Sequence, residues 1–335
     1  MSSSQPTVSI GVPTYNRPDG VLRTLKQLAA QNYQNLEIVV SNNCSTNEIV
    51  RPLLDECARR DPRIKVIHQS ENIGLVNNFK YVLEKSTSDF FMWAADDDEW
   101  HPDFVKVCVE THLQHKVGTV MTGFYRDFRA HNHKGVANLP LMTGDDRFAD
   151  VMGFFNTMPH SMFYGLHRRS TVLWFADAAN TTGDDEYLLL RQMLLNGVRT
   201  VPDQVLYTAG VDDVKYKIKL PPEAADRYVF QCRRLMQFAT LLLEANQITD
   251  AQRLAIMQRM VVNRLHFVLD FEADMREPGQ YELTKILYHF FSQLRLPNIN
   301  LYTKAMFEIN QAQDAAAAAA RAAAEAAAAS TQAPT

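Results

Sequence analysis

Short β-rich segments and amphipathic helical segments alternate over the first hundred residues, and this pattern constrains the fold more than any other feature of the sequence. The expected strands span residues 7–12, 36–40, 64–68 and 90–95. After each of the first three strands, apolar residues recur at helical spacing. Such alternation is typical of βαβ units with right-handed crossovers. We therefore predict an α/β fold in which a mostly parallel sheet is flanked by helices.

A polar loop follows each of these expected strands. The loops are residues 13–18, 41–46 and 71–74 and the acidic run 96–98, and each is rich in side chains that can form hydrogen bonds. In sheets of this kind, ligands bind at the carboxyl ends of the strands. The four loops are therefore expected to converge on one crevice.

The acidic run consists of three consecutive carboxylates, Asp96, Asp97 and Asp98. Adjacent carboxylates repel one another unless a cation, solvent or hydrogen-bond donors compensate. Their oxygen atoms suit Mg²⁺ or Mn²⁺ as ligands. A solvated acidic turn would have the same sequence, so the run alone leaves both interpretations open.

The composition excludes some classes of function. The chain of 335 residues has a formal net charge of −4, so nucleic acid is not the expected partner. Its four cysteines are scattered and form no CxxC pair, which favours a reducing cytoplasm. The first residues lack the basic and apolar regions of a signal peptide, and no apolar stretch approaches about 18 residues. We therefore expect a cytoplasmic protein without a transmembrane segment.

The character of the sequence changes along the chain and indicates four regions. Residues 1–6 are expected to be a flexible amino terminus, and residues 7–215 to form the α/β domain. Apolar stripes at helical spacing from about residue 223 predict a helical region over residues 216–312. Residues 313–335 form an alanine-rich, low-complexity tail, to which we assign no chemistry.

Six motifs, taken together and in this order, resemble the family 2 glycosyltransferases, enzymes of the GT-A fold that use nucleotide-sugar donors. The motifs are residues 12–17, 41–46, 71–74, 95–98, 164–169 and 183–188. Each motif is weak alone, but their order is specific, and the resemblance covers about residues 7–210. It implies a glycosyltransferase that moves a sugar, from a UDP-sugar by preference, to a glycan or lipid-linked glycan. Synthesis of surface polysaccharide or glycoconjugates is the implied role.

The resemblance also implies which residues bind the nucleotide donor. Four residues of the first loop would border the nucleotide: Pro13, Thr14, Tyr15 and Arg17. A tyrosine ring suits a base or ribose, and backbone amides in such a loop suit a diphosphate. Filling space in the loop is the alternative role of Tyr15. Asn72, in the third loop, is a further candidate for the donor site.

Asn43 stands where many family members have an aspartate that accepts the N3 proton of uracil. Its amide can accept that proton or, turned over, donate to N3 of a cytosine. UDP-sugars remain the first choice, but CDP- and dTDP-sugars are less disfavoured than usual. Asn42 would contact the base edge or only hold the turn, a role for which asparagine is well suited.

Within the acidic run, the resemblance implies a divalent metal, Mg²⁺ or Mn²⁺, that bridges the donor diphosphate. Asp98 would be its direct ligand and Asp97 the second candidate. The contact with the ribose stays open between Asp96 and Asp97. One or two carboxylates, completed by phosphate oxygens, are the usual way in which Mg²⁺ is held.

Asp185 matches the catalytic base of the family, which takes a proton from the acceptor hydroxyl in a single, inverting displacement. Favourable charge in a first helical turn is the alternative role of Asp184 and Asp185. Asp184 and His160 are candidates for the acceptor site, although a lone histidine in such a place is more often structural. His160 precedes residues 162–164, which we expect to be a strand.

Two other classes of function are compatible with parts of this pattern. A sugar nucleotidyltransferase also uses Mg²⁺ held by carboxylates, but its glycine-rich entry loop is absent from residues 12–19. A non-catalytic module that binds nucleotides or glycans would keep the same fold.

A basic stretch would press the protein against an anionic membrane or form a solvated face. Its residues are Lys215, Lys217, Lys219, Arg227, Arg233 and Arg234.

Overall fold

The structure, a computed structural model, describes residues 5–178, 184–211 and 237–260. The chain divides into two compact units, and almost all of the described residues belong to the unit formed by residues 1–220 and 232–257. The following description concerns this unit, which contains the predicted α/β domain.

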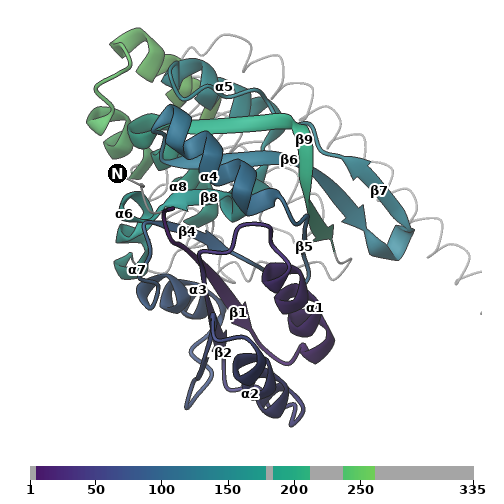
Figure 1. The fold of residues 1–335 in the computed structure, drawn as a ribbon. Helices are drawn as coiled ribbons and strands as arrows, with labels where there is room; N and C mark the ends of the chain where they lie inside the picture. Colours follow the sequence, from purple (N-terminus) through teal and green to yellow (C-terminus); the bar gives the residue numbers. More distant parts are fainter. Residues whose placement is uncertain (1–4, 179–183, 212–236, 261–335) are drawn as a thin grey trace, which may run out of the picture. The chain divides into compact units, whose positions relative to one another are not determined.

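A nine-stranded sheet forms the centre of the unit (Figure 1). Its strands are β1 (Val8–Thr14), β2 (Leu36–Asn42), β3 (Ile64–His68), β4 (Phe90–Trp93), β5 (Glu99–Trp100), β6 (Thr119–Phe128), β7 (His133–Val136), β8 (Leu166–Arg168) and β9 (Val198–Val211). Their order across the sheet is β3-β2-β1-β4-β8-β6-β9-β5, and β7 pairs with β6 as a hairpin. The α/β fold class predicted from the sequence is confirmed.

The first half of the sheet is parallel, as the sequence predicts. β1 pairs in parallel with β2 and β4, and β2 pairs in parallel with β3. Every residue of β1 and β2 is buried, which is usual for parallel strands covered on both faces. All four predicted strands form, with β1 and β2 each extended by two residues at the carboxyl end and β4 ending two residues earlier, at Trp93.

The second half of the sheet is mixed and differs from the predicted parallel pattern. β8 runs antiparallel between β4 and β6, while β9 pairs in parallel with β6 and antiparallel with β5. The predicted strand at residues 162–164 is wrong, because these residues lie in a short 3₁₀ helix, η2 (His160–Tyr164). The preceding helix ends at Met158 in the left-handed conformation (φ 44°), and Pro159 then restricts the backbone. The strand begins only at Leu166.

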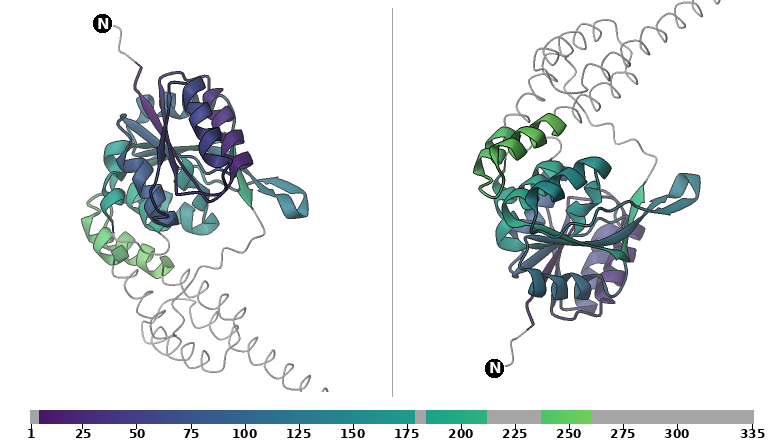
Figure 2. Two further views of the ribbon diagram at one scale, coloured as in Figure 1. Left: turned by 90° about the horizontal axis from the view of Figure 1, so that it is seen from below. Right: turned by 90° about the horizontal axis from the view of Figure 1, so that it is seen from above.

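Helices cover the parallel half of the sheet on both faces (Figures 1 and 2). The helices of the whole unit are α1 (Pro18–Ala29), α2 (Val50–Arg60), α3 (Leu75–Glu84), α4 (Phe104–His115), α5 (Arg147–Thr157), α6 (Arg169–Val172), α7 (Trp174–Asp177) and α8 (Asp184–Arg191), with the short 3₁₀ helix η1 (Arg129–His131) and the π-helix η3 (Gln192–Asn196). α1 and α2 contact each other, whereas α3 contacts β1 and β2. Right-handed crossovers place α3 on the face opposite α1, since the connection from β3 to β4 reverses direction across the sheet.

Local sequence explains how α1 and α3 lie against the sheet. Pro18 starts α1 at a position where its missing N–H costs nothing, and Asp19 complements the helix dipole. Against the opposite face, α3 packs closely over Gly11 of β1. A Cβ atom there would lie 2.6 Å from Val82, so the close approach of helix and strand requires glycine at this position.

A buried carboxylate ties the strands together at the end opposite their polar loops. Glu37 accepts hydrogen bonds from the Ser9 hydroxyl and, at 3.0 Å, from the backbone N–H of Thr87. Lys65 Nζ lies 2.6 Å from the same carboxylate. These contacts join β1, β2, β3 and the residues before β4, and they help to fix the register in which the strands reach the opposite end.

The predicted helical region is only partly within the described residues. Residues 237–244 and 250–260 are helical, as expected. The basic stretch and the alanine-rich tail lie outside the described residues. Among the helices that are described, none has the length and hydrophobicity needed to cross a membrane.

Two histidines are buried beside β8 and are held in the neutral form. His112 Nε2 donates to the carbonyl of Leu166 at 2.8 Å, and His167 Nε2 donates to the carbonyl of Phe163 at 2.9 Å. His167 Nδ1 also accepts from the hydroxyl of Thr119. Burial lowers the pKa of each imidazole to about 4.

We therefore expect His167→Gln to cost less stability in acid than at neutral pH. The unfolded chain binds a proton at its ordinary pKa near 6.5, whereas the folded protein does so only near 4. Stability contributed by neutral His167 is thus complete above pH 6.5 and lost as the pH falls towards 4. Urea unfolding should show the difference between wild type and variant shrinking by about 2 kcal/mol from pH 7.5 to pH 5. A constant or widening difference would contradict this assignment.

Candidate active site

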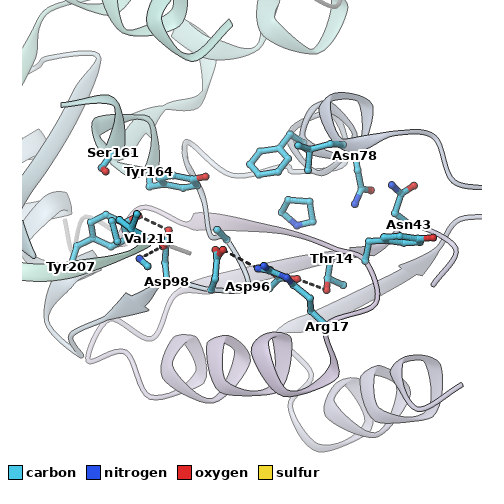
Figure 3. Close-up of a pocket in the computed structure, with 18 of the residues that line it drawn as sticks. Thr14, Arg17, Asn43, Asn78, Asp96, Asp98, Ser161, Tyr164, Tyr207 and Val211 are labelled. Carbon is cyan, nitrogen blue, oxygen red and sulfur yellow. Dashed lines mark hydrogen bonds and ion pairs between the residues drawn. The ribbon is translucent and has the colours of Figure 1, made fainter. Parts of the chain in front are cut away.

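A cavity of about 550 Å³ lies at the carboxyl ends of β1, β2 and β4 (Figure 3). This volume falls within the range of roughly 300 to 1,000 Å³ that is usual for small-molecule sites. All four polar loops predicted from the sequence contribute to the lining, together with η2 and β9. The lining residues are Pro13, Thr14, Tyr15, Arg17, Asn43, Asn72, Leu75, Asn78, Phe79, Ala95, Asp96, Asp97, Asp98, Ser161, Tyr164, Tyr207, Ala209, Gly210 and Val211.

Thr14 and Arg17 join the first loop to the acidic turn formed by Asp96, Asp97 and Asp98. Thr14 Oγ1 donates to Asp96 Oδ2 at 2.8 Å. Arg17 Nη1 lies 3.0 Å from Asp96 Oδ1 and 2.9 Å from Asp97 Oδ2 (Figure 3). Burial lowers the pKa of Arg17, but the two carboxylates outweigh it and raise that pKa above its ordinary value. The guanidinium therefore stays charged and offsets the repulsion between Asp96 and Asp97.

Asp98 is the most deeply buried carboxylate of the turn, with 3% of its surface exposed. Its Oδ2 accepts from the Tyr207 hydroxyl and its Oδ1 accepts from the Gly210 N–H at 2.8 Å (Figure 3). Burial raises the pKa of Asp98 to about 7, although these two hydrogen bonds act in the opposite direction. Burial also raises the pKa of Asp96 above its ordinary value, against the effects of Thr14 and Arg17. The surroundings thus disfavour negative charge on both carboxylates, and a bound cation would relieve this.

Two glycines allow the neighbouring elements to approach the backbone of the acidic turn. A Cβ atom on Gly20 of α1 would lie 2.3 Å from the carbonyl oxygen of Asp96. A Cβ atom on Gly210 of β9 would lie 2.4 Å from the carbonyl oxygen of Asp97. Arg129 donates to the same carbonyl of Asp97. Contacts from both α1 and β9 therefore fix the turn.

Asn43 and Asn72 form a polar clamp between the second and third loops. Asn43 Oδ1 accepts from the N–H of Ile73 at 2.9 Å, and its Nδ2 donates to Asn72 Oδ1 at 2.9 Å and to the carbonyl of Gly74 at 3.4 Å. Asn72 Oδ1 also accepts from the N–H of Gly74. Because backbone N–H groups can only donate, these contacts fix which end of each amide is oxygen.

Asn42 does not line the cavity, in contrast to the other asparagines predicted for the site. Its Oδ1 accepts from the N–H of Ser45 at 3.1 Å, and its Nδ2 lies 3.0 Å from His68 Nδ1. The side chain therefore holds the turn, which was the alternative to a contact with the base. Tyr15 does line the cavity, with 41% of its surface exposed.

Asp185 and His160 lie beside the cavity and contact each other. His160 Nδ1 is 3.4 Å from Asp185 Oδ2. Neither side chain lines the cavity, but Ser161, which follows His160 in η2, does. α8, which contains Asp185 in its first turn, packs against η2. Asp184 begins α8, but its side chain lies outside the described residues.

The wall of the cavity opposite the loops that follow β1, β2 and β3 was not identified from the sequence. It comprises Ser161 and Tyr164 from η2 and Tyr207 and Gly210 from β9. Tyr164 begins one of the six family motifs, so a signal was present there. Tyr207 meets Asp98 across 109 residues of sequence, and no local pattern marks such a contact.

The donor atoms of the acidic turn fit a divalent cation such as Mg²⁺ or Mn²⁺. They are carboxylate oxygens that line one cavity, and burial disfavours the charge of Asp96 and Asp98 in the absence of a cation. Over the described ranges, no cluster of three or more His, Cys, Asp or Glu side chains is placed to hold a metal alone. A cation at this turn would need further oxygen ligands, for example from a phosphate group.

Comparisons with known proteins place this arrangement in a family. The family model described as "Glycosyl transferase family 2" matches residues 9–174. An uncharacterised glycosyltransferase of Haemophilus influenzae is 29% identical over 140 residues, which are 42% of this chain and 43% of that protein. A GalNAc(5)-diNAcBac-PP-undecaprenol beta-1,3-glucosyltransferase of Campylobacter jejuni is 30% identical over 95 residues, 28% of this chain and 30% of that protein. The chain thus spans less than half the length of these two relatives.

A solved structure extends the similarity beyond the region of sequence identity. Residues 1–349 of S. aureus TarS, in complex with UDP-GlcNAc, superpose with a TM-score of 0.66 at 17% identity. The match covers 82% of this chain and 77% of that one. It confirms the predicted GT-A fold, and the sequence match covers strands β1 to β4 and the loops after them that line the cavity. The chain belongs to glycosyl transferase family 2.

Proposed function

We propose that the protein transfers a sugar from a nucleotide-sugar donor to a hydroxyl group of a glycan or lipid-linked glycan, with inversion at the anomeric carbon. The observation that carries the proposal is the position of the acidic turn in the cavity. It lies between the asparagine clamp and the wall formed by η2 and β9 (Figure 3). A base, a diphosphate and a sugar would occupy these three parts in sequence. The UDP-GlcNAc bound to TarS supports a donor of this type.

Asp98 and Asp97 would hold a divalent cation, Mg²⁺ or Mn²⁺, together with oxygens of the donor diphosphate. When bound, the cation would neutralise charge that develops on the departing diphosphate. The buried position of Asp98 supports this role, since its charge is costly without a cation nearby. Tyr207 and Gly210 would keep its carboxylate oriented while the cation and donor bind.

Asp185 would act as the base. Its carboxylate would take the proton of the acceptor hydroxyl as that oxygen bonds to the anomeric carbon and the bond to the diphosphate breaks. The packing of α8 against η2 supports a place on the acceptor side, because Ser161 and Tyr164 of η2 line the cavity. His160 and Asp184 would lie on the same side.

The asparagine clamp favours a UDP-sugar over a CDP-sugar. Asn43 Nδ2 already donates to Asn72 Oδ1 and to the carbonyl of Gly74, so both of its hydrogens have acceptors. Asn43 Oδ1 receives one hydrogen bond, from Ile73, and a carbonyl oxygen can accept two. The remaining capacity is that of an acceptor, which suits the N3–H of uracil and not the unprotonated N3 of cytosine.

A lipid-linked glycan at the inner membrane face is suggested by the name of the C. jejuni relative, which contains undecaprenol. The basic stretch that would face an anionic membrane lies outside the described residues. A sugar nucleotidyltransferase receives no support from the family match, whereas a non-catalytic module is separated from an enzyme by the experiments below.

Thermal stability tests which nucleotide-sugar donor the protein binds. UDP-sugars should raise the melting temperature in the presence of Mn²⁺ more than CDP-sugars do, because uracil offers an N3–H to Asn43 Oδ1 and cytosine does not. A ligand at 100 times its dissociation constant adds about 2.7 kcal/mol of stability, which corresponds to several degrees. Asn43→Asp should keep the preference for UDP, because a carboxylate retains the acceptor. A larger shift with a CDP-sugar would contradict the clamp argument, and no shift with any donor would contradict the proposed function.

Replacement of Asp98 tests its role as the buried ligand of the cation. Asp98→Asn should abolish Mn²⁺-dependent donor binding and yet stabilise the free protein. Asn Oδ1 can accept from Gly210 and Nδ2 can donate to the Tyr207 oxygen, so no hydrogen bond is lost. Between its ordinary pKa of 3.8 and the folded value of about 7, wild-type Asp98 binds more proton when folded, so stability falls as the pH rises.

The stabilisation by Asp98→Asn should therefore be greater at pH 8 than at pH 5, by about 2 to 3 kcal/mol in urea unfolding. Asp103→Asn, on a side chain that is 41% exposed, is the matched control for removal of a carboxylate outside the cavity. An Asp98→Asn protein that is less stable than wild type at pH 8, or that still binds donor with Mn²⁺, would contradict the assignment.

Replacement of Asp185 separates donor binding from turnover. Asp185→Asn should retain the Mn²⁺-dependent thermal shift with a UDP-sugar, because Asp185 lies outside the lining of the cavity. Its turnover should fall by at least about 100-fold, the usual contribution of general base catalysis. Release of UDP, measured over time, provides the comparison. Unchanged turnover would remove Asp185 from the mechanism.

A further inference from the structure

The contact between His160 and Asp185 joins two residues that come from different elements. His160 is the first residue of η2, and Asp185 lies in the first turn of α8. His160 Nδ1 and Asp185 Oδ2 are 3.4 Å apart, and the two side chains are 47% and 40% exposed. Contacts between catalytic groups are often longer in the absence of substrate than in the reacting complex. His160 directly precedes Ser161, which lines the cavity wall.

The local backbone directs the His160 ring towards Asp185. α5 ends at Met158 in the left-handed conformation, and the N–H of His160 donates to the carbonyl of Met158 at 2.9 Å. The edge of the ring packs on Phe154, with centroids 6.1 Å apart and planes inclined at 76°. Because a left-handed residue other than glycine is unfavourable, this turn is maintained by the packing around it.

His101 provides a contrast within the same chain. Its Nδ1 lies 3.7 Å from Asp103 Oδ2, and the side chains are 53% and 41% exposed, much as in the first pair. However, His101 Nδ1 accepts a hydrogen bond from the backbone N–H of Asp103 at 3.2 Å. The neutral His101 ring must therefore carry its proton on Nε2. His101 is a matched histidine that does not donate to its aspartate.

We propose that His160 is a positioning residue that donates a hydrogen bond from Nδ1 to Asp185 and so holds the carboxylate against η2. The role rests on the proposed function, in which Asp185 takes the proton of the acceptor. A carboxylate on a half-exposed first helical turn has several rotamers, and fixing one of them keeps the base close to the reacting hydroxyl. His160 would not touch the donor, so its removal should change turnover and not donor binding.

The tautomer of His160 tests the pairing without any substrate. Long-range ¹H–¹⁵N NMR spectra of the full chain, at a pH where the rings are neutral, identify which nitrogen carries the proton. We expect Nδ1–H for His160 in wild type and conversion to Nε2–H in Asp185→Asn. His101 should show Nε2–H in both proteins. An Nε2–H tautomer of His160 in wild type would overturn the proposal.

The kinetic test uses two amides that place their N–H groups differently. The amide nitrogen of asparagine, Nδ2, can occupy the place of histidine Nδ1. The amide nitrogen of glutamine, Nε2, corresponds instead to histidine Nε2. We expect His160→Gln to lower kcat roughly tenfold, the usual effect of losing one hydrogen bond to a charged group. The KM for the donor should stay within about twofold of the wild-type value, and His160→Asn should recover most of the rate.

The assay measures UDP released from UDP-N-acetylglucosamine and UDP-glucose with Mn²⁺, with water as the acceptor. His101→Gln is the matched control and should retain the wild-type rate. Equal rates for wild type and His160→Gln, or equal losses in the Gln and Asn variants, would overturn the positioning role. Failure of wild type to bind or cleave any nucleotide sugar would instead overturn the proposed function, and the tautomer would still decide whether the pair exists.

Discussion

Burial of two carboxylates, Asp96 and Asp98, on either side of the partly exposed Asp97 is the constraint on which the rest of the site depends. Thr14 and Arg17 hold Asp96 and Asp97 from one side, while β9 holds Asp98 from the other. These contacts reduce the cost of charge in a poorly hydrated place but do not remove it, since the pKa of Asp98 remains raised. The protein therefore keeps an unfavourable charge at the position where a cation and a diphosphate would bind.

The two sides of the cavity have different structural origins. One side comes from consecutive βαβ units, in which β1, β2 and β4 are buried throughout and Glu37 helps to fix the register at the far end. The opposite side comes from η2 and from β9, which pairs with β6 and β5 in the mixed half of the sheet. Regular parallel strands thus support one side of the cavity, whereas a short 3₁₀ helix and a long strand with shifts in its register form the other.

The parts of the molecule that sequence predicts well are those set by local patterns. Strands β1 to β4 are short segments rich in β-branched and other apolar residues, and each is followed by polar residues that reach one cavity. The 3₁₀ helix η2 was missed because an apolar triplet is compatible with either structure, and the left-handed Met158 gives no signal in composition. The contacts of Tyr207 with Asp98 and of His160 with Asp185 depend on how distant elements pack. The side chain of Asn42 is held within the local turn, where its Oδ1 accepts from the N–H of Ser45.

The dependence of Asp98 on β9 also has a consequence for the order of folding. Tyr207 and Gly210 follow Asp98 by 109 and 112 residues, so ribosomes release the acidic turn long before its partners. The two hydrogen bonds from β9 to Asp98 can form only when β9 has joined β6 in the sheet. A nascent chain that ends before β9 therefore lacks the contacts that hold Asp98 from the side opposite Thr14 and Arg17.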